Sequence, residues 1–180
     1  MAMVPFCQQH GIQLLPYGVL AGGLLTDRYL GAPLDSVRLD TYSKQKYASV
    51  IREAGGWSWF QVGRRGPPRP HRSVGRSWRL VSTNSNGTRR MQDLLRVLRR
   101  IADKHETSIA NVATRWVLDR PTVAGVILGA RNASHVADHV SIFERGLILD
   151  QEDMGQIAEV LARGRQARND CYTWERGGGW

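Results

Sequence analysis

The sequence lacks any long hydrophobic run. No apolar stretch reaches the roughly 18 residues that a helix needs to cross a bilayer, and residues 1–8 carry no basic cluster ahead of an apolar segment. We therefore expect neither a membrane-spanning helix nor a secretory leader. Cysteine is also scarce, because only Cys7 and Cys171 are present, near opposite ends and without metal-ligand spacing. We expect both thiols to be reduced and the protein to be cytoplasmic.

Acidic residues are missing from residues 62–92, which carry most of the net charge. The chain of 180 residues has a formal charge of +9. Between positions 62 and 92 there are eight arginines and no Asp, Glu or Lys, which leaves +1 for all the other residues. The basic character therefore belongs to one segment, and this argues against nucleic acid as a partner of the protein as a whole.

The same segment also lacks helical or strand periodicity. It contains Pro67, Pro68, Pro70 and four glycines, a composition typical of a disordered insertion. Three interpretations stay open: a solvated loop insertion, an arginine-rich arm for RNA or another anionic surface, and a retained intron. Codons for Val and Gln can supply intron-like ends, and removal of the segment joins Gln61 to Asp93 at the start of an amphipathic helix.

Two short apolar runs predict buried parallel strands. Residues 12–16 lead into a glycine-bearing loop at 17–26, and residues 123–128 lead into another at 129–132. Ligands of α/β proteins bind at the carboxyl ends of parallel strands. Glycine also lets backbone N–H groups come close to a phosphate or a flat ring. The two loops are therefore the candidate cofactor site.

Helical periodicity occupies most of the remaining chain. We expect helices over residues 4–10, 43–53 and 93–105, and three more that are capped by Thr107 or Ser108, by Asn132 and by Asp150. Val136 and Val140 should face the core, and residues 29–45 should form a surface excursion. Helices that alternate with strands predict an α/β fold in one domain. Two strands cannot cover their own edges, so this architecture indicates part of something larger.

The order and spacing of these motifs resemble the carboxyl-terminal part of aldo-keto reductases, the NADP-dependent (β/α)8-barrel oxidoreductases. The likeness rests on residues 11–25, 109–116 and 126–131, and on the spacing from Gly129 to His139. The resemblance implies an incomplete (β/α)8 TIM barrel that holds only carboxyl-terminal strands and helices. Its parts are residues 1–61 and 93–176, interrupted by the insertion at 62–92 and followed by a flexible tail at 177–180.

The resemblance also implies a nicotinamide nucleotide site on the two loops. Tyr17 would stack on the nicotinamide, Arg28 would close over the diphosphate, and Arg131 would hold the 2′-phosphate of NADP, with NAD as the alternative. Asp138 and His139 would meet the adenine. The full set of expected cofactor contacts is Tyr17, Gly18, Val19, Leu20, Ala21, Gly22, Arg28, Gly129, Ala130, Arg131, His135, Asp138 and His139. His135 and His139 lie one helical turn apart but have no third ligand, so no metal is expected.

By the same resemblance, the Asp, Tyr, Lys and His residues of family catalysis lie on strands that precede this chain. No catalytic role is therefore carried over to any residue here. We expect a truncated aldo-keto reductase-like oxidoreductase that retains mainly the cofactor-binding half. The parent activity is NADPH-dependent reduction of a small aldehyde or ketone, or the reverse oxidation of an alcohol. The alternative is a non-catalytic binding or regulatory module whose arginine-rich arm binds nucleic acid or a partner protein.

Overall fold

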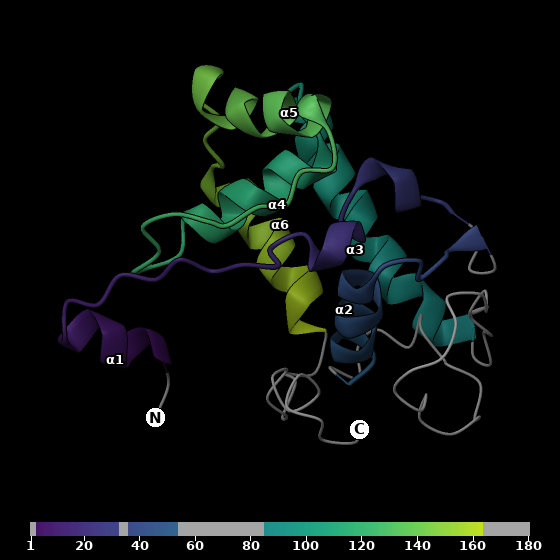
Figure 1. Cartoon of the computed structure of the whole chain (residues 1–180), viewed down its shortest axis with the longest axis horizontal. Coiled ribbons are helices and arrows are strands. Elements are labelled where there is room, and N and C mark those ends of the chain that lie inside the picture. Colours follow the sequence, from purple (N-terminus) through teal and green to yellow (C-terminus); the bar gives the residue numbers. More distant parts are fainter. Residues whose placement is uncertain (1–2, 33–35, 54–84, 164–180) are drawn as a thin grey trace.

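The computed structural model describes residues 3–32, 36–53 and 85–163 (Figure 1). Their elements in chain order are α1 (Met3–Gln9), η1 (Ala21–Gly23), η2 (Asp27–Tyr29), α2 (Tyr42–Glu53), α3 (Ser85–Lys104), α4 (Ile109–Leu118), α5 (Ala133–Glu144) and α6 (Gln151–Ala162). The expectations for residues 62–84, for Cys171 and for the tail at 177–180 lie outside the described residues. Cys7 is buried as a free thiol. Within the described ranges, no helix is long and apolar enough to cross a membrane.

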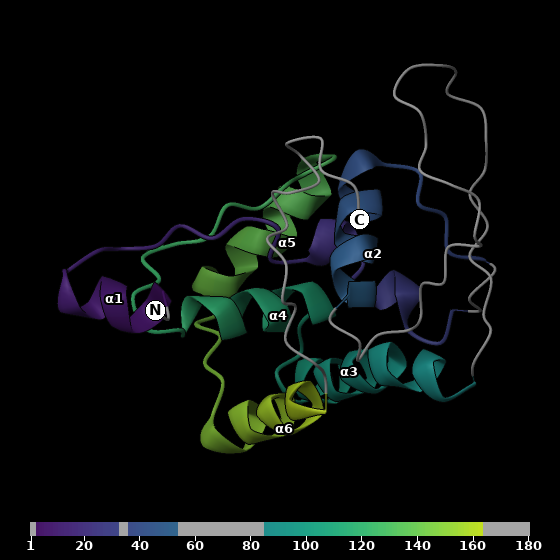
Figure 2. The same cartoon turned by 90° about the horizontal axis from the view of Figure 1, so that it is seen from below.

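Helix α3 is the centre of the core. It packs against α4 and α6, and Figure 2 shows α6 running alongside it. The predicted apolar face of α3 is buried as expected and consists of Leu94, Leu95, Leu98, Ile101 and Ala102. Because these positions recur at the helical period, one face meets the neighbouring helices while the charged face stays in solvent.

Helix α3 begins at Ser85, earlier than predicted. Met91 and Gln92, which the sequence pattern assigns to a disordered insertion, are buried. The expectation of disorder is therefore wrong for residues 85–92. The physical reason is that the apolar period of α3 extends back to Met91, and Gln92 has a buried bonding partner on another segment.

The predicted helix caps are present. The side chain of Ser108 accepts a hydrogen bond from the Asn111 N–H at the start of α4. Asn132 accepts one from the His135 N–H at the start of α5. Asp150 and Asp153 form a reciprocal capping box at α6. These bonds satisfy N–H groups that the first helical turn leaves without intrahelical partners.

The two predicted strands pair in parallel but form no continuous ladder among the described residues. Leu14 bridges Val123, and Tyr17 bridges Ile127. Two residues separate the bridges on the first segment and three on the second, so an extra residue interrupts the pairing in the manner of a β-bulge. Pro16 also has no N–H to donate. The incomplete barrel therefore stays a prediction, although the two runs do lie side by side.

Two further expectations are wrong. Residues 29–45 are not simply a surface excursion, because Tyr29, Val37 and Leu39 are buried in the core. Val136 and Val140 are exposed on α5 instead of facing inward. Helix α5 buries Ile142 instead, on the side that faces α4. The helical spacing of Val136 and Val140 correctly indicates an apolar stripe on α5. Which side of α5 is buried, however, depends on where α4 packs against it.

Candidate functional site

Tyr17 lies where the first apolar segment ends, beside the second. Its backbone bridges Ile127, and the Ile127 N–H donates to the Pro16 carbonyl oxygen at 2.9 Å. The residue is 45% exposed. The Lys46 ammonium nitrogen lies 5.1 Å from the ring centroid and 3.5 Å from the hydroxyl oxygen. The parallel pairing thus places a half-exposed aromatic ring where the two loops start.

The glycines of the first loop serve the packing of α2. Gly18 and Gly22 both have positive φ, at +71° and +68°, which favours glycine. A Cβ on Gly18 would overlap the Tyr47 side chain, and one on Gly22 would come within 2.9 Å of the Ser43 backbone. The absence of a side chain at these two glycines therefore lets α2 pack closely against the loop. The packing of α2 thus explains why both positions are glycine, which the sequence alone did not reveal.

Hydrogen bonds within the first loop already use part of its backbone. The Ala21 N–H donates to the Gly18 carbonyl at 2.8 Å, and the Gly23 N–H donates to the Leu20 carbonyl at 2.9 Å. Leu20 and Ala21 also pack against the core cluster. Val19 is half-buried beside them. The loop is thus a tight, internally bonded turn, and not an open row of N–H donors.

An ion pair at the start of α2 lies near the second loop. The Lys44 ammonium donates to Asp40 Oδ1 at 2.7 Å. This hydrogen bond lowers the pKa of Asp40, and the charge of Arg131 lowers it further. Burial opposes the charge on Lys44, but the bonds to Asp40 and Tyr29 outweigh burial and raise its pKa. Arg131 therefore lies within electrostatic reach of the segment that leads into α2.

The second loop presents an exposed cation ahead of α5. Gly129, Ala130 and Arg131 are all exposed, and a Cβ on Gly129 would meet nothing within 4 Å. The Arg131 N–H donates to His135 Nδ1 at 3.2 Å, which closes the first turn. The start of a helix favours anions because its first N–H groups point outward. Here an exposed guanidinium adds a full positive charge to that position.

Asp138 and His139 lie further along α5, and Asp138 bonds to the start of α4. Ser108 Oγ donates to Asp138 Oδ2 at 3.0 Å, and Asn111 Nδ2 donates to Asp138 Oδ1 at 3.2 Å. A carboxylate oxygen can accept more than one hydrogen bond, so these contacts leave Asp138 further capacity. The Nδ1 atom of His139 is buried without a hydrogen-bond partner in the described part of the chain.

Arg28 lies apart from these residues in its contacts. It is exposed on η2, and its guanidinium carbon lies 5.8 Å from the centroid of the Tyr29 ring. The structure therefore places Tyr17 beside the segment that leads into the second loop, and Arg131 lies within electrostatic reach of Asp40. Among the described residues, no hydrogen bond, ion pair or ring contact joins Arg28 to either group.

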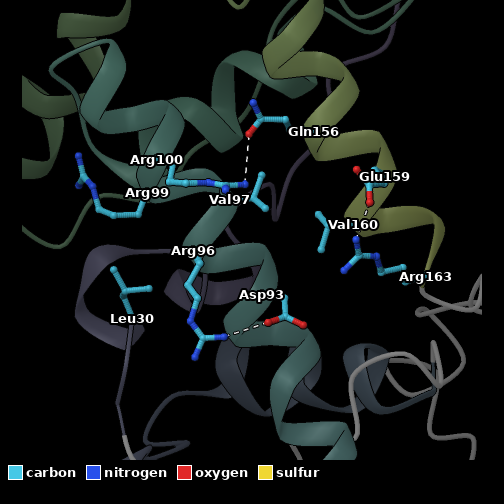
Figure 3. Close-up of a pocket in the computed structure, with 10 residues that line it drawn as sticks. All are labelled: Leu30, Asp93, Arg96, Val97, Arg99, Arg100, Gln156, Glu159, Val160 and Arg163. Atoms are coloured by element: carbon cyan, nitrogen blue, oxygen red, sulfur yellow. Dashed lines mark hydrogen bonds and ion pairs between the residues drawn. The ribbon is translucent and has the colours of Figure 1, made fainter.

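A groove between α3 and α6 lies outside the predicted site. It encloses about 540 Å³, and its ten lining residues include none of the thirteen expected cofactor contacts. Figure 3 shows Arg96 bonding to Asp93 and Arg163 bonding to Glu159, whereas Arg100 of α3 bonds to Gln156 of α6. Arg99 bonds to Asp27 and Asp103. Most of the positive charge along this groove is thus already balanced by carboxylates.

Sequence reasoning missed the lysines of α2 at the candidate site. Lys44 and Lys46 are each only 5% exposed, which is rare for lysine. The spacing of Asp40 and Lys44 by four residues was a signal for an ion pair. Nothing in the sequence indicated Lys46, because its partner Tyr17 is distant along the chain. Within the described residues, no group of three His, Cys, Asp or Glu side chains could hold a metal ion.

The chain matches known proteins in two comparisons. The profile of the aldo/keto reductase family matches residues 2–162. Flagellar radial spoke protein 5 of Chlamydomonas reinhardtii is 30% identical to this chain over 120 residues. That alignment covers 65% of this chain and 17% of the radial spoke protein. The chain therefore spans about a sixth of the length of that relative.

Proposed function

Because this chain belongs to the aldo/keto reductase family, we propose that it carries the nucleotide-binding part of an NADP-dependent oxidoreductase. The parent reaction would be the reduction of a small aldehyde or ketone by NADPH, or the reverse oxidation of an alcohol. NADP supplies the hydride chemistry when bound. We propose no catalytic residue in this chain, and we expect it to bind the nucleotide without turning over a carbonyl substrate.

One observation carries the proposal. The parallel bridge between Tyr17 and Ile127 puts the ends of the two apolar segments side by side, at the point where both loops begin. Tyr17, on one loop, is a half-exposed aromatic residue, and Arg131, on the other, carries an exposed guanidinium. These groups suit the nicotinamide ring at one end of NADP and the 2′-phosphate at the other end. An aromatic face suits a nicotinamide ring, and a guanidinium suits a phosphate through paired hydrogen bonds.

The described residues fit NADP at some positions better than at others. Tyr17, Gly129, Ala130, Arg131 and His135 have exposed surface. We propose that Tyr17 holds the nicotinamide, that Arg131 holds the 2′-phosphate, and that Asp138 and His139 lie near the adenine. Residues 18–22 and Arg28 are proposed for the diphosphate. At this part of the site, α2 covers Gly18 and Gly22, and two loop N–H groups already have partners.

Titration of the purified chain with NADPH, followed by nucleotide fluorescence, tests the proposal. We expect saturable binding that Tyr17→Ala weakens for both NADPH and NADH. Arg131→Ala should weaken NADPH by about tenfold, as expected for a charge-assisted contact, and leave NADH nearly unchanged. Arg145→Ala is the matched control, because Arg145 donates to the Glu106 carbonyl at 3.0 Å, away from both loops.

Two results would contradict this function. A wild-type chain that binds no nicotinamide nucleotide would remove the proposed site. Steady, aldehyde-dependent consumption of NADPH by the pure chain would show instead that it contains its own catalytic residues.

A further inference from the structure

The imidazole of His135 is bonded to the backbone of the loop that carries Arg131. Its Nδ1 atom accepts a hydrogen bond from the Arg131 N–H at 3.2 Å. A backbone N–H group can only donate, so Nδ1 carries no proton in this contact. The imidazole is therefore neutral here, and its single proton lies on Nε2. The contact thus identifies one protonation state of the residue.

A second proton on His135 changes what this loop offers to a ligand. The imidazolium has a donor on both nitrogens, so it cannot accept the Arg131 N–H. The imidazolium and the Arg131 N–H are then two donors that need an acceptor. Because both residues are exposed, a bound anion can reach them. Protonation thus replaces a bond within the loop by two donors, one of which is charged.

No carboxylate of the described residues forms an ion pair with His135. Asp138, three residues along α5, accepts hydrogen bonds from Ser108 and Asn111. A proton on His135 therefore adds a charge that a ligand can neutralise. The charged or titratable groups on the elements next to it are Arg131, Asp138 and His139 on the loop and α5, the paired Arg115 and Asp119 on α4, and the paired Asp40 and Lys44 at the start of α2.

NADP differs from NAD by one phosphate group, on the 2′-oxygen of the adenosine ribose. A phosphate monoester has three strong acceptor oxygens and close to two negative charges at neutral pH. The 2′-hydroxyl of NAD carries no charge. An imidazolium beside Arg131 therefore suits the phosphate of NADP and has no counterpart to neutralise in NAD.

We propose that the protonated form of His135 selects NADP over NAD, so that this selectivity rises as the pH falls below neutral. The inference rests on the proposed function, because it requires the 2′-phosphate to lie at Arg131. Histidine side chains take up their proton between about pH 8 and about pH 5. An exposed ion pair with the phosphate strengthens the binding of NADP by about fivefold. The gain ends near about pH 6, where the phosphate takes up its own second proton.

The experiment measures the dissociation constants of NADP⁺ and NAD⁺ for the full chain by isothermal titration calorimetry, at about pH 8 and about pH 6.5. The oxidised nucleotides are used because the reduced ones decompose in acid. His135→Gln still accepts a hydrogen bond but takes up no proton, whereas His135→Lys is charged at both pH values. His10→Gln is the matched control, because His10 is also exposed and its ring lies against Phe6, at a centroid distance of 4.3 Å. Far-ultraviolet circular dichroism at both pH values checks that every variant is folded.

We expect the ratio of the NAD⁺ constant to the NADP⁺ constant to rise by about threefold from about pH 8 to about pH 6.5 in the wild-type chain and in His10→Gln. It should stay level or fall in His135→Gln, and it should be high at both pH values in His135→Lys. A wild-type ratio that does not rise, or an equal rise in His135→Gln, would overturn the inference and leave the proposed function intact. If His135→Gln does not fold, a rise in His135→Lys as large as in the wild-type chain would overturn it. Failure of the wild-type chain to bind either nucleotide at either pH would overturn the proposed function itself.

Discussion

The carboxamide of Gln92 joins α3 to the backbone at the end of η2. Its Nε2 atom donates to the Tyr29 carbonyl at 2.8 Å, and its Oε1 atom accepts from the Gly31 N–H at 2.7 Å. Gln92→Ala would leave both backbone groups without this partner, so we expect a loss of about 3 kcal/mol in the free energy of unfolding. Urea denaturation measures it. Gln151→Ala, at an exposed position of α6, should change it by less than about 0.5 kcal/mol.

Deletion of residues 62–92 provides a second test of the same contact. Gln61 then precedes Asp93 directly and takes the position of Gln92, while Phe60 takes that of Met91. We expect the shortened chain to keep its free energy of unfolding within about 1 kcal/mol, because Phe60 and Gln61 replace the buried Met91 and Gln92 of α3 and the length of the connecting loop has a small effect on stability. Gln61→Ala in that background should lose as much as Gln92→Ala in the full chain.

A shortened chain that does not fold, or one that tolerates Gln61→Ala, would show that the segment is part of the fold. If the shortened chain is stable, sequencing of the mature transcript then distinguishes a retained intron from a loop insertion.

Substitution of two glycines in the first loop separates steric overlap from backbone strain. Gly18 and Gly23 both have positive φ, but only Gly18 has a neighbour in the space that a Cβ would fill. Gly23→Ala should therefore lose about 1 kcal/mol of stability from backbone strain alone. Gly18→Ala should lose about 2 kcal/mol more, because Tyr47 must move. Equal losses in thermal or urea unfolding would mean that Tyr47 adjusts freely.

Acid sensitivity should depend on Lys104. Its hydrogen bond lowers the pKa of Asp150 to about 2 from an ordinary value of 3.8. The unfolded chain therefore binds this proton more readily, so the stabilisation is complete above about pH 4 and is lost as the pH falls toward 2. We expect Lys104→Met to show a smaller loss of unfolding free energy between pH 5 and pH 2.5 than the wild-type chain.

Arg145→Met is the control for this pH series, because Arg145 donates to a backbone carbonyl, which does not titrate. It should keep the wild-type pH dependence. A Lys104→Met profile parallel to that of the wild-type chain would contradict the assignment.

The outer side of α5 should promote self-association. Val136, Val140 and Phe143 are exposed at helical spacing and form one apolar stripe. We expect Phe143→Glu to reduce the apparent mass of the chain in sedimentation velocity at high concentration, without loss of helical circular dichroism. Ile142→Ser should instead destabilise the fold, because Ile142 is buried. An unchanged sedimentation profile in Phe143→Glu would mean that this stripe does not mediate contacts between copies.

The sequence predicts local structure well where one segment contains the whole signal. The face of α3 follows from the spacing of Leu94, Leu98 and Ile101, and the three caps follow from single polar residues ahead of an apolar period. The sequence also predicts that the two apolar segments lie side by side in parallel, because each is short and apolar and is followed by glycine. These features depend on residues that lie a few positions apart.

Features that depend on distant partners were not predictable in this way. The period of α5 does not say that Val136 faces solvent, because the orientation depends on where α4 lies. Val123 and Ile127 are separated by one residue more than their bridge partners Leu14 and Tyr17, and this difference interrupts the ladder. It cannot be recognised from either segment alone. At the candidate site, the contact between Lys46 and Tyr17 could not be predicted, because it depends on how α2 packs on the first loop.

Helix α2 contacts one end of the proposed nucleotide site and lies within electrostatic reach of the other. Lys46 reaches Tyr17, and the Asp40–Lys44 pair lies within the field of Arg131. A small rotation of this one helix would therefore move the stacking ring and, at the same time, change the electrostatic field at the phosphate cation. Binding at one end should consequently change the affinity at the other. The two halves of a dinucleotide would then bind cooperatively through the movement of α2.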